Sequence, residues 1–439
     1  MLNAFYNKGG KIKNIFWLKE VDRSLSIHAG EKAAQIGELI KSGVNVPPGF
    51  VISSAVYFGF LKHTGLDKKI DLLLSGLDTE NTRLLQKQSN ILEKTILAQK
   101  FPESFEKELK EALTKLSSTH NSWAVRFSPA MLDRKHSPFA GQQKAFLNIK
   151  NEAQLKKAVL KMYSVLFSPS SIYYRAMHRF SHFDVGAAII VQKMINVQKS
   201  GILFTINPLT GGKDEMMVEA GLGLGEPIAE GTVNPDQYVL DKKSGETIRQ
   251  VINFQPWKLG LGADLKHTAI KGKARSSAKL SPEEISTLFR WSKKIERHFS
   301  LPQNVEWGFE KEILYFFESA PITENSATVP SQHKRTTSAP GSLGHEIAHG
   351  VGASLGIETG PVRLIHKPED LAEIKQGEIL VTEMTKPTFI PALKKVRAII
   401  TDTGGATSHA ALIARELGIP AVVGTGQATH ILRNNQIVT

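Results

Sequence analysis

The stretch that most limits the fold of this chain lies near its end, at residues 396–424. It joins an apolar run (VRAIIT), a turn with two adjacent glycines (DTGGAT), a run of helix formers (SHAALIARELG) and a second apolar run (AVVG). Glycine allows turn conformations that β-branched residues disfavour, and Gly418 followed by Pro420 is typical of a helix end. The order predicts strand, turn, helix and strand, with His409 near the start of the helix.

His409 is therefore expected where a helix offers free backbone N–H groups. These groups and the positive end of the helix dipole favour an anion. They disfavour an imidazolium, which keeps the ring neutral and nucleophilic near pH 7. A neutral imidazole beside an anion-binding turn suits phosphoryl transfer through a phosphohistidine. From the histidine alone, the commoner explanation would be a capped or half-buried residue at a helix start.

The chain has 439 residues, which is enough for two or three domains with their own cores. A stretch at 324–344 is rich in Ser, Thr, Pro and Gly, has little apolar content and is typical of a linker. After it, strand-like runs alternate with helix signals, as in a small β/α domain. We therefore predict an α/β (α+β) chain with a large domain at 1–323, a linker at 324–349 and a small β/α domain at 350–439.

The composition limits where this chain works and what it binds. It contains no cysteine, which excludes disulfides and thiolate metal sites and favours a reducing compartment. A net charge of +13 would suit nucleic acid, lipid or an anionic small molecule. Basic clusters such as KGKARSSAK (271–279) are short and lack interleaved aromatic residues, and no apolar run approaches the ~20 residues that span a bilayer. We expect a cytoplasmic protein that binds neither nucleic acid nor a membrane.

The segment HEIAH at 345–349 satisfies the H-E-x-x-H pattern of zinc proteases. Glycines crowd both of its ends, including Gly344 and Gly350, which disfavours the long helix that such a zinc site needs. The third ligand position of the longer pattern is Leu355 rather than histidine. We therefore expect no zinc site here.

The string TDTGGATSHAALIARELGIPAVVG closely resembles the phosphohistidine signature of the phosphoenolpyruvate (PEP)-utilizing enzymes. This family includes phosphoenolpyruvate synthase, pyruvate phosphate dikinase and rifampin phosphotransferase. The resemblance implies that His409 accepts a phosphoryl group and passes it on, with Thr407, Ser408 and Arg415 at the flanking motif positions. It also implies that the C-terminal domain is a swivelling domain.

The same family carries an ATP-grasp-like nucleotide-binding domain ahead of the histidine domain, and the first three hundred residues resemble it. The matching segments are GEKAAQIGELIKSGVNVPPGF, WAVRFS, FAGQQ, VQKMINVQKSGILFTINPLTG and VEAGLGLGEPIAEGTVNPDQYVLD. The resemblance puts a lysine and an arginine on the ATP phosphates, and the planar fork of arginine suits bidentate phosphate binding. The residues at the family's ATP-site positions are Lys32, Arg126, Gly141, Gln142, Gln192 and Glu219.

The segment NVEWGFEKEILYFFESAPIT resembles the hairpin that closes this ATP site. With its turn near residues 310–312, Glu306 and Glu318 have the same parity on neighbouring strands, and both carboxylates point to one face. Adjacent carboxylates repel unless a cation lies between them, and Mg²⁺ bound with ATP fits that place. The alternative is an exposed face of an edge hairpin.

Five positions depart from the family's ATP-site pattern: Glu31, Ala33, Pro129, Glu318 and Ala320. Two replace glycines beside the lysine, one replaces a serine after the arginine, and two replace the usual glutamine and arginine of the closing hairpin. Each change would weaken ATP binding. A partly degenerate ATP site therefore stays open as an alternative.

The resemblance implies an ATP-dependent phosphotransferase that phosphorylates its own His409 and passes the group to an acceptor. The domain order is that of the synthase, which implies transfer of the ATP β-phosphoryl group to pyruvate, with PEP, AMP and phosphate as products. The sequence stops at Thr439, so we expect the pyruvate-binding barrel on a separate chain or missing. Two alternatives remain: a rifampin-phosphotransferase-like enzyme with another small-molecule acceptor, and a weakened ATP-binding regulatory relic.

Overall fold

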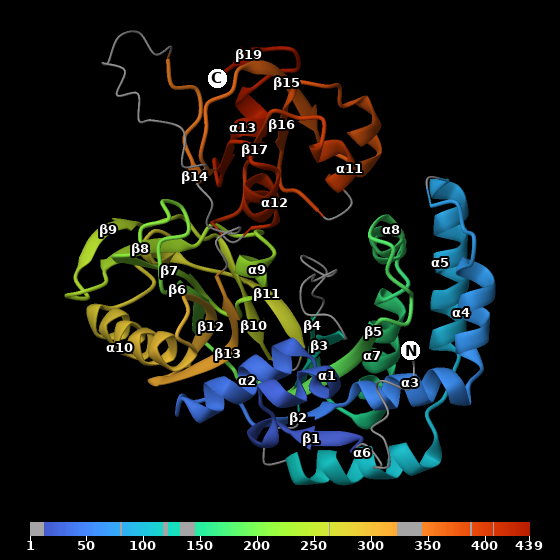
Figure 1. Ribbon diagram of the computed structural model, residues 1–439. Helices are drawn as coiled ribbons and strands as arrows, with labels where there is room; N and C mark the ends of the chain where they lie inside the picture. The colour runs from blue at the N-terminus through green and yellow to red at the C-terminus, as the bar shows by residue number, and fades with distance from the viewer. Residues whose placement is uncertain are drawn as a thin grey trace. The chain divides into compact units, whose positions relative to one another are not determined.

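The computed structural model describes residues 13–79, 81–116, 122–131, 145–262, 264–322, 345–386, 389–406 and 408–439. No helix in these ranges is both long and apolar enough to cross a membrane. The chain divides into two compact units. Unit 1 contains Met1–Ile195 and Phe316–Ser319, and unit 2 contains Asn196–Tyr315 and Ala320–Thr439. Both units combine helices with β-sheet (Figure 1), which confirms the mixed α and β content predicted from the sequence.

The strands of unit 1 are β1 (Ile15–Trp17), β2 (Gly49–Ile52), β3 (Trp123–Met131), β4 (Ala145–Ile149) and β5 (Val185–Lys193). They form one sheet in the order β1-β2-β5-β3-β4, and every neighbouring pair is antiparallel. β2 and β5 read GFVI and VGAAIIVQK, and nearly all of their side chains are buried. Continuous apolar runs of this kind are typical of strands that are covered on both faces.

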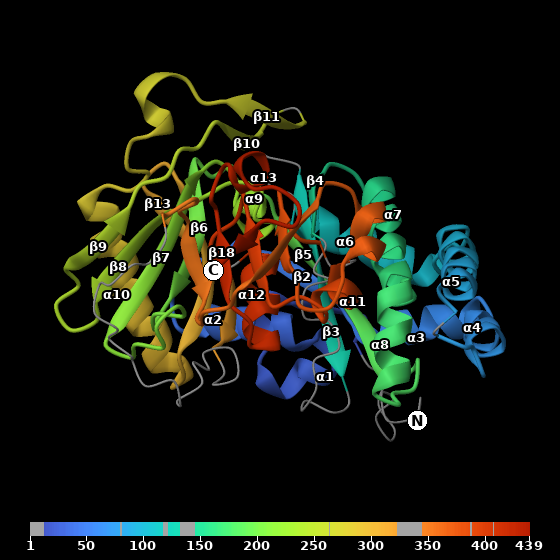
Figure 2. The same cartoon turned by 90° about the horizontal axis from the view of Figure 1, so that it is seen from above.

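The helices of unit 1 are α1 (Ser26–Ala29), α2 (Glu31–Lys41), α3 (Ser54–His63), α4 (Leu66–Leu74), α5 (Thr82–Leu97), α6 (Glu103–Leu116), α7 (Glu152–Val165) and α8 (Pro169–Met177). α4 and α5 lie side by side in Figure 1 and in Figure 2. Apolar side chains from α3, α5, α6 and α7 join those of the sheet in one large core. This core includes side chains of β3, whereas α2 packs through Ala33, Ala34 and Ile36 into a second core on the same sheet.

α2 begins directly after Gly30 and carries Lys32 in its first turn. The φ angle of Gly30 is 80°, a region that favours glycine, and a Cβ there would lie 2.2 Å from the Ser128 Oγ. The same Ser128 Oγ accepts a hydrogen bond from the Ala33 N–H at 3.1 Å. These contacts tie the start of α2 to β3, the strand that also carries Arg126.

The first part of unit 2 is a six-stranded sheet with a long helix against it. Its elements are β6 (Lys199–Phe204), β7 (Glu215–Leu222), α9 (Glu226–Ala229), β8 (Asp236–Asp241), β9 (Thr247–Val251), β10 (Trp257–Leu261), β11 (Leu265–Ala269), α10 (Pro282–Phe299), β12 (Gln303–Glu310) and β13 (Ile313–Pro321). The strand order is β13-β12-β6-β7-β8-β9, with β10 and β11 as a separate hairpin (Figure 2). Residues 316–319 of β13 are assigned to unit 1. α10 starts with a capping box between Ser281 and Glu284.

The last part of unit 2 is a mixed β/α module. Its elements are β14 (Val351–Ser354), β15 (Gly360–Ile365), β16 (Ile379–Thr382), α11 (Ile390–Leu393), β17 (Ala398–Thr401), α12 (His409–Leu417), β18 (Ala421–Val423), α13 (Ala428–Ile431) and β19 (Ile437–Val438). The order is β14-β18-β17-β16-β15-β19, with the four central strands parallel and both edge strands antiparallel. The alternation of strands and helices predicted for this region is confirmed.

Most of the predicted linker, residues 323–344, lies outside the described residues. The division into 1–323, 324–349 and 350–439 therefore stays a prediction. Residues 345–350 are described and form neither helix nor strand, so HEIAH has no helix that could carry a zinc site. Among the described residues, no group of three or more His, Cys, Asp or Glu side chains could hold a metal ion.

Candidate functional site

His409 is the first residue of α12, directly after the glycine turn. The Ser408 side chain caps the helix by accepting a hydrogen bond from the Ala411 N–H at 3.4 Å, and Gly418 ends it with a φ of 65°. β17 precedes the turn and β18 follows the helix. The predicted order of strand, turn, helix and strand around His409 is therefore confirmed.

Thr385 holds the imidazole of His409. The Thr385 Oγ1 lies 2.8 Å from the His409 Nδ1, and the Thr385 side chain is buried. Burial lowers the pKa of His409 to about 4, which keeps the ring neutral at pH 7. In the tautomer with the proton on Nδ1, the threonine oxygen accepts a hydrogen bond from Nδ1–H and Nε2 carries the lone pair. The arrangement presents a neutral nitrogen nucleophile on a fixed ring.

Sequence reasoning missed Thr385, which lies 24 residues before the histidine. β16 ends at Thr382 and β17 ends at Thr401, and these two residues are partners in the parallel ladder. The segments that follow the two strands therefore leave the same edge of the sheet, where ligand and catalytic residues of parallel sheets gather. This rule could have identified Thr385 from the sequence, because Thr385 comes just after a predicted strand.

Arg415 acts on the loop that precedes His409. Its Nη2 donates a hydrogen bond of 2.6 Å to the Ala406 carbonyl. Burial lowers the pKa of Arg415, and the nearby carboxylates of Glu219 and Glu416 oppose that shift. The guanidinium of Arg415 thus links α12 to the glycine loop through the Ala406 carbonyl. Thr407, also predicted as a site residue, lies outside the described residues.

A cationic cluster lies in unit 1 and consists of Lys32, Arg126 and Glu318. The Glu318 Oε2 is 2.8 Å from the Lys32 Nζ and 3.7 Å from the Arg126 Nη1. The Arg126 Nη1 also donates to the Phe317 carbonyl at 3.4 Å. The three side chains are 9%, 17% and 14% exposed in the order Lys32, Arg126, Glu318. Two cationic side chains thus contact one carboxylate, and lysine and arginine are the side chains that bind anions such as phosphate.

The other predicted site residues are spread over both units. Gln192 is buried on β5 in unit 1 and donates to the Pro47 carbonyl at 3.2 Å. Glu219 is buried on β7 in unit 2, where its Oε1 accepts hydrogen bonds from the Ala406 N–H at 2.7 Å and the Gln237 Nε2 at 3.1 Å. Gly141 and Gln142 lie outside the described residues. The structure thus brings Lys32, Arg126 and Glu318 together, and it joins Glu219 to the histidine loop.

The predicted metal ligands are Glu306 and Glu318. Glu306 belongs to β12 in unit 2 and Glu318 to the part of β13 in unit 1. β12 and β13 are neighbours in the sheet order. Carboxylate oxygens are the donors that Mg²⁺ prefers, so the residue types fit. Their joint coordination of one ion stays a prediction.

Two family models match this chain. The first, described as pyruvate phosphate dikinase, AMP/ATP-binding domain, matches residues 27–339. The second, described as PEP-utilising enzyme, mobile domain, matches residues 374–439. Among solved structures, an ADP complex of N5-carboxyaminoimidazole ribonucleotide synthetase matches 69% of this chain and 47% of its own at 13% identity and a TM-score of 0.29. That score is too low to support an argument about the fold.

Curated relatives are named as synthases. A probable phosphoenolpyruvate synthase of Archaeoglobus fulgidus is 38% identical over 97% of this chain and 57% of its own length. A phosphoenolpyruvate synthase of Pyrococcus furiosus is 31% identical over 97% of this chain and 57% of its own length. This chain therefore spans little more than half the length of these relatives. From the match to most of its residues, the chain belongs to the family of the pyruvate phosphate dikinase AMP/ATP-binding domain and carries a PEP-utilising mobile domain after it.

Proposed function

We propose that this chain transfers a phosphoryl group from ATP to His409 and then to a small-molecule acceptor. The observation that carries the proposal is the half-buried imidazole at the start of α12, with its Nδ1 against the Thr385 Oγ1. Burial holds the pKa of His409 at about 4, so the ring needs no general base to become a nucleophile at pH 7.

Lys32 and Arg126 are the proposed phosphate-binding residues. Their positive charges would offset charge on the transferring group, and catalysis of phosphoryl transfer is mostly positioning and electrostatics. Gly141, Gln142, Gln192 and Glu219 belong to the proposed ATP site on the strength of the family match. Glu306 and Glu318 are the proposed ligands of Mg²⁺, which would neutralise phosphate charge when bound with ATP.

The covalent step joins an imidazole nitrogen to phosphorus. In the proposed reaction, the N–P bond to the β phosphorus forms while the bond from that phosphorus to the AMP oxygen breaks. Water releases the γ phosphoryl group as phosphate, and the β phosphoryl group stays on His409. An ATP-grasp-like fold for the nucleotide-binding region and a swivelling motion of the histidine module are parts of this proposal, as is a cytoplasmic location.

Pyruvate is the proposed acceptor because the curated relatives are named phosphoenolpyruvate synthase. The chain matches little more than half of their length. The acceptor site is therefore proposed in a PEP/pyruvate-binding domain that corresponds to the remaining length of these relatives. The transfer would give PEP and regenerate the neutral imidazole.

A second candidate is an ATP-binding relic, and one contact favours it. The Glu318 carboxylate lies against Lys32 at 2.8 Å, where the family often has glutamine. A carboxylate there competes with phosphate for the lysine. The two candidates differ in turnover, since a relic would bind ATP without phosphorylating His409.

The test is incubation of the chain with Mg²⁺ and ATP labelled separately at the β and γ positions. We expect an acid-labile protein label from the β position that is absent in His409→Ala and present in His430→Ala, a change of another histidine in the same module. Retention of the label in His409→Ala, or no label at any nucleotide concentration, would overturn the proposal. Addition of pyruvate with a separately expressed barrel domain of a relative then tests the acceptor.

A further inference from the structure

The histidine loop, residues 403–406, makes hydrogen bonds to side chains of the six-stranded sheet region. Both parts belong to unit 2. The Gly404 N–H donates to the Asn234 Oδ1 at 2.9 Å, and the Ala406 N–H donates to the Glu219 Oε1 at 2.7 Å. The Asn234 Nδ2 donates to the Gly424 carbonyl at 3.4 Å. Glu219 on β7 and Asn234 in the segment before β8 thus accept hydrogen bonds from the N–H groups of Ala406 and Gly404.

The loop also packs closely against that surface. Ala406 is fully buried among Ile202, Phe204, Met217, Ile228, Val233 and Val239. A Cβ on Gly405 would lie 2.5 Å from the Glu219 Oε1 and 2.9 Å from the Pro235 Cγ. The second glycine of the Gly-Gly pair is therefore needed for this close approach as well as for the turn.

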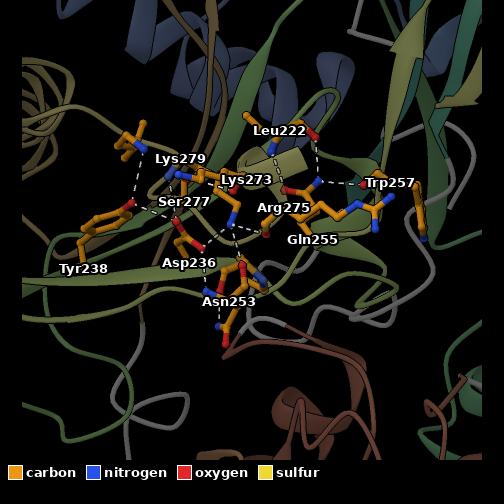
Figure 3. Close-up of polar contacts among 12 residues, drawn as sticks. Leu222, Asp236, Tyr238, Asn253, Gln255, Trp257, Lys273, Arg275, Ser277 and Lys279 are labelled. Atoms are coloured by element: carbon orange, nitrogen blue, oxygen red, sulfur yellow. Dashed lines mark hydrogen bonds and ion pairs between the residues drawn. The ribbon is translucent and has the colours of Figure 1, made fainter. Parts of the chain in front are cut away.

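The two acceptors are themselves held in place. The Gln237 Nε2 donates to the Glu219 Oε1 at 3.1 Å. Next to Asn234, the Pro235 carbonyl accepts from the Asn253 Nδ2 at 2.7 Å, and Asp236 accepts from the Asn253 N–H at 2.9 Å. Figure 3 shows Asp236 at the centre of this buried polar network. A group held this firmly loses little entropy when it binds the loop.

We infer that Glu219 and Asn234 are positioning residues that dock the histidine loop onto the sheet of residues 196–315. They act through the backbone N–H groups of Ala406 and Gly404, and they set where His409 lies during phosphorylation. The expected effect on the rate of His409 phosphorylation rests on the proposed function. The docking contact itself does not depend on ATP. Release of the histidine module then requires both acceptor bonds to break.

The ATP-binding role predicted for Glu219 and this docking role have different kinetic consequences. Loss of an ATP ligand raises the KM for ATP. Loss of a docking residue lowers the rate of His409 phosphorylation and leaves that KM unchanged, because ATP would still bind. We expect Glu219→Ala to lower the rate at saturating ATP. A rise in the KM for ATP with an unchanged rate would overturn the docking role.

Amide hydrogen exchange of the whole chain without nucleotide tests the contact directly. We expect Glu219→Ala to speed exchange of the Ala406 N–H about ten- to a hundredfold, as for a hydrogen bond to a charged group. Asn234→Ala should speed exchange of the Gly404 N–H by a smaller factor. Glu219→Gln keeps a carbonyl acceptor, so exchange of the Ala406 N–H should stay close to the wild-type rate. Glu246→Ala, a change of an exposed glutamate, serves as the control.

The Ile399 N–H, which is bonded to the Pro420 carbonyl inside the histidine module, reports on the stability of that module. It should exchange at the wild-type rate in every variant. Unchanged exchange of Gly404 and Ala406 in both alanine variants would overturn the inference, as would equal acceleration of Ile399. Because no ATP is present, failure of this experiment is distinct from failure of the proposed phosphoryl transfer.

Discussion

Two lysine–carboxylate pairs of this chain have similar lengths and different surroundings. The Nζ–O distance is 3.0 Å for Lys279 and Asp236 and 2.8 Å for Lys32 and Glu318. The first pair is 1% and 0% exposed, and the second is 9% and 14% exposed. The second carboxylate also lies 3.7 Å from the Arg126 Nη1, so two cationic side chains contact it.

The first pair is saturated with hydrogen bonds (Figure 3). The Lys279 ammonium donates to Asp236, to the Asn253 carbonyl at 2.6 Å and to the Arg275 carbonyl at 3.4 Å. Asp236 accepts from the Lys279 N–H at 2.9 Å and from the Tyr238 hydroxyl at 3.1 Å. Buried charges persist only when they are paired and hydrogen-bonded in this way. The pair therefore serves the structure.

The comparison shows that the degree of burial and the number of cations around the carboxylate distinguish a structural ion pair from a proposed ligand site. The pair in unit 2 is neutral and closed to solvent. The cluster of Lys32, Arg126 and Glu318 places two cationic side chains beside one carboxylate and is partly open to solvent. Three substitutions, two of them with matched controls, and a titration would break or sharpen this distinction.

The largest effect is expected for Lys279→Met, which leaves Asp236 buried without its cation. Removal of one partner of a buried pair costs about 3–5 kcal/mol. We expect a loss of that size in the free energy of unfolding, measured by urea denaturation. Lys13→Met is the control, since the Lys13–Glu20 pair is 50% and 41% exposed and such pairs contribute at most about 1 kcal/mol. Equal losses in both variants would remove the distinction.

The next effect is on activity. Lys32→Met should lower the rate of His409 phosphorylation about 10²–10³-fold, the usual loss for a group that stabilises developing charge. Lys41→Met is the matched control on the same helix, because Lys41 is exposed and paired with Asp22 and Glu38. The readout is phosphohistidine formation at saturating ATP. Rates within twofold of each other would exclude Lys32 from the phosphate site.

Glu318→Gln tests the carboxylate of the cluster. Without Mg²⁺, we expect ATP to bind about fivefold more tightly, because exposed or partly exposed ion pairs contribute up to about 1 kcal/mol and the amide no longer competes with phosphate. With Mg²⁺ the gain should disappear, because Glu318 is one of the two proposed metal ligands. Calorimetric titrations with and without the metal measure both. The same gain under both conditions would exclude Glu318 from the metal site.

Unlike these charged pairs, His409 avoids the free-energy cost of a partly buried charge because its imidazole stays neutral. Its pKa of about 4 lies below the value near 6.5 of an unfolded chain. Between these values the unfolded state binds more protons, so the stability due to the buried neutral ring is present above pH 6.5 and is lost as pH falls to 4.

Imidazole NMR titration of His409 measures this difference. At pH 6 the ring should be almost entirely neutral, whereas an unshifted histidine would be about one-quarter neutral. We expect the rate of phosphorylation to fall less than fourfold from pH 8 to pH 6 if this group alone sets the acid limb. A midpoint near 6.5 in the folded chain would contradict the burial of the ring.

Local patterns predicted much of the fold around the histidine. Gly418, Pro420 and the two glycines were enough to predict strand, turn, helix and strand, because those signals act over a few residues. The family motif around Lys32 and Arg126 likewise identified two residues that lie in one cluster.

The local patterns did not predict the contacts between distant segments. Thr385 meets His409 because β16 and β17 are parallel neighbours, and Glu219 meets Ala406 across 187 residues of sequence. Lys279 looked like part of an exposed basic cluster, yet its side chain is buried beside Asp236. Sequence shows the residue types, but the partner that neutralises a charge is set by the tertiary fold.

The most direct test of the central claim is a single-turnover, rapid-quench measurement of AMP and phosphohistidine from Mg²⁺ and β-labelled ATP. We predict that both appear at the same rate and in equal amounts in the wild type. His409→Ala should give neither, while His430→Ala gives both. AMP formed by His409→Ala at the wild-type rate would contradict the account, because the phosphoryl group would then leave ATP without passing through His409.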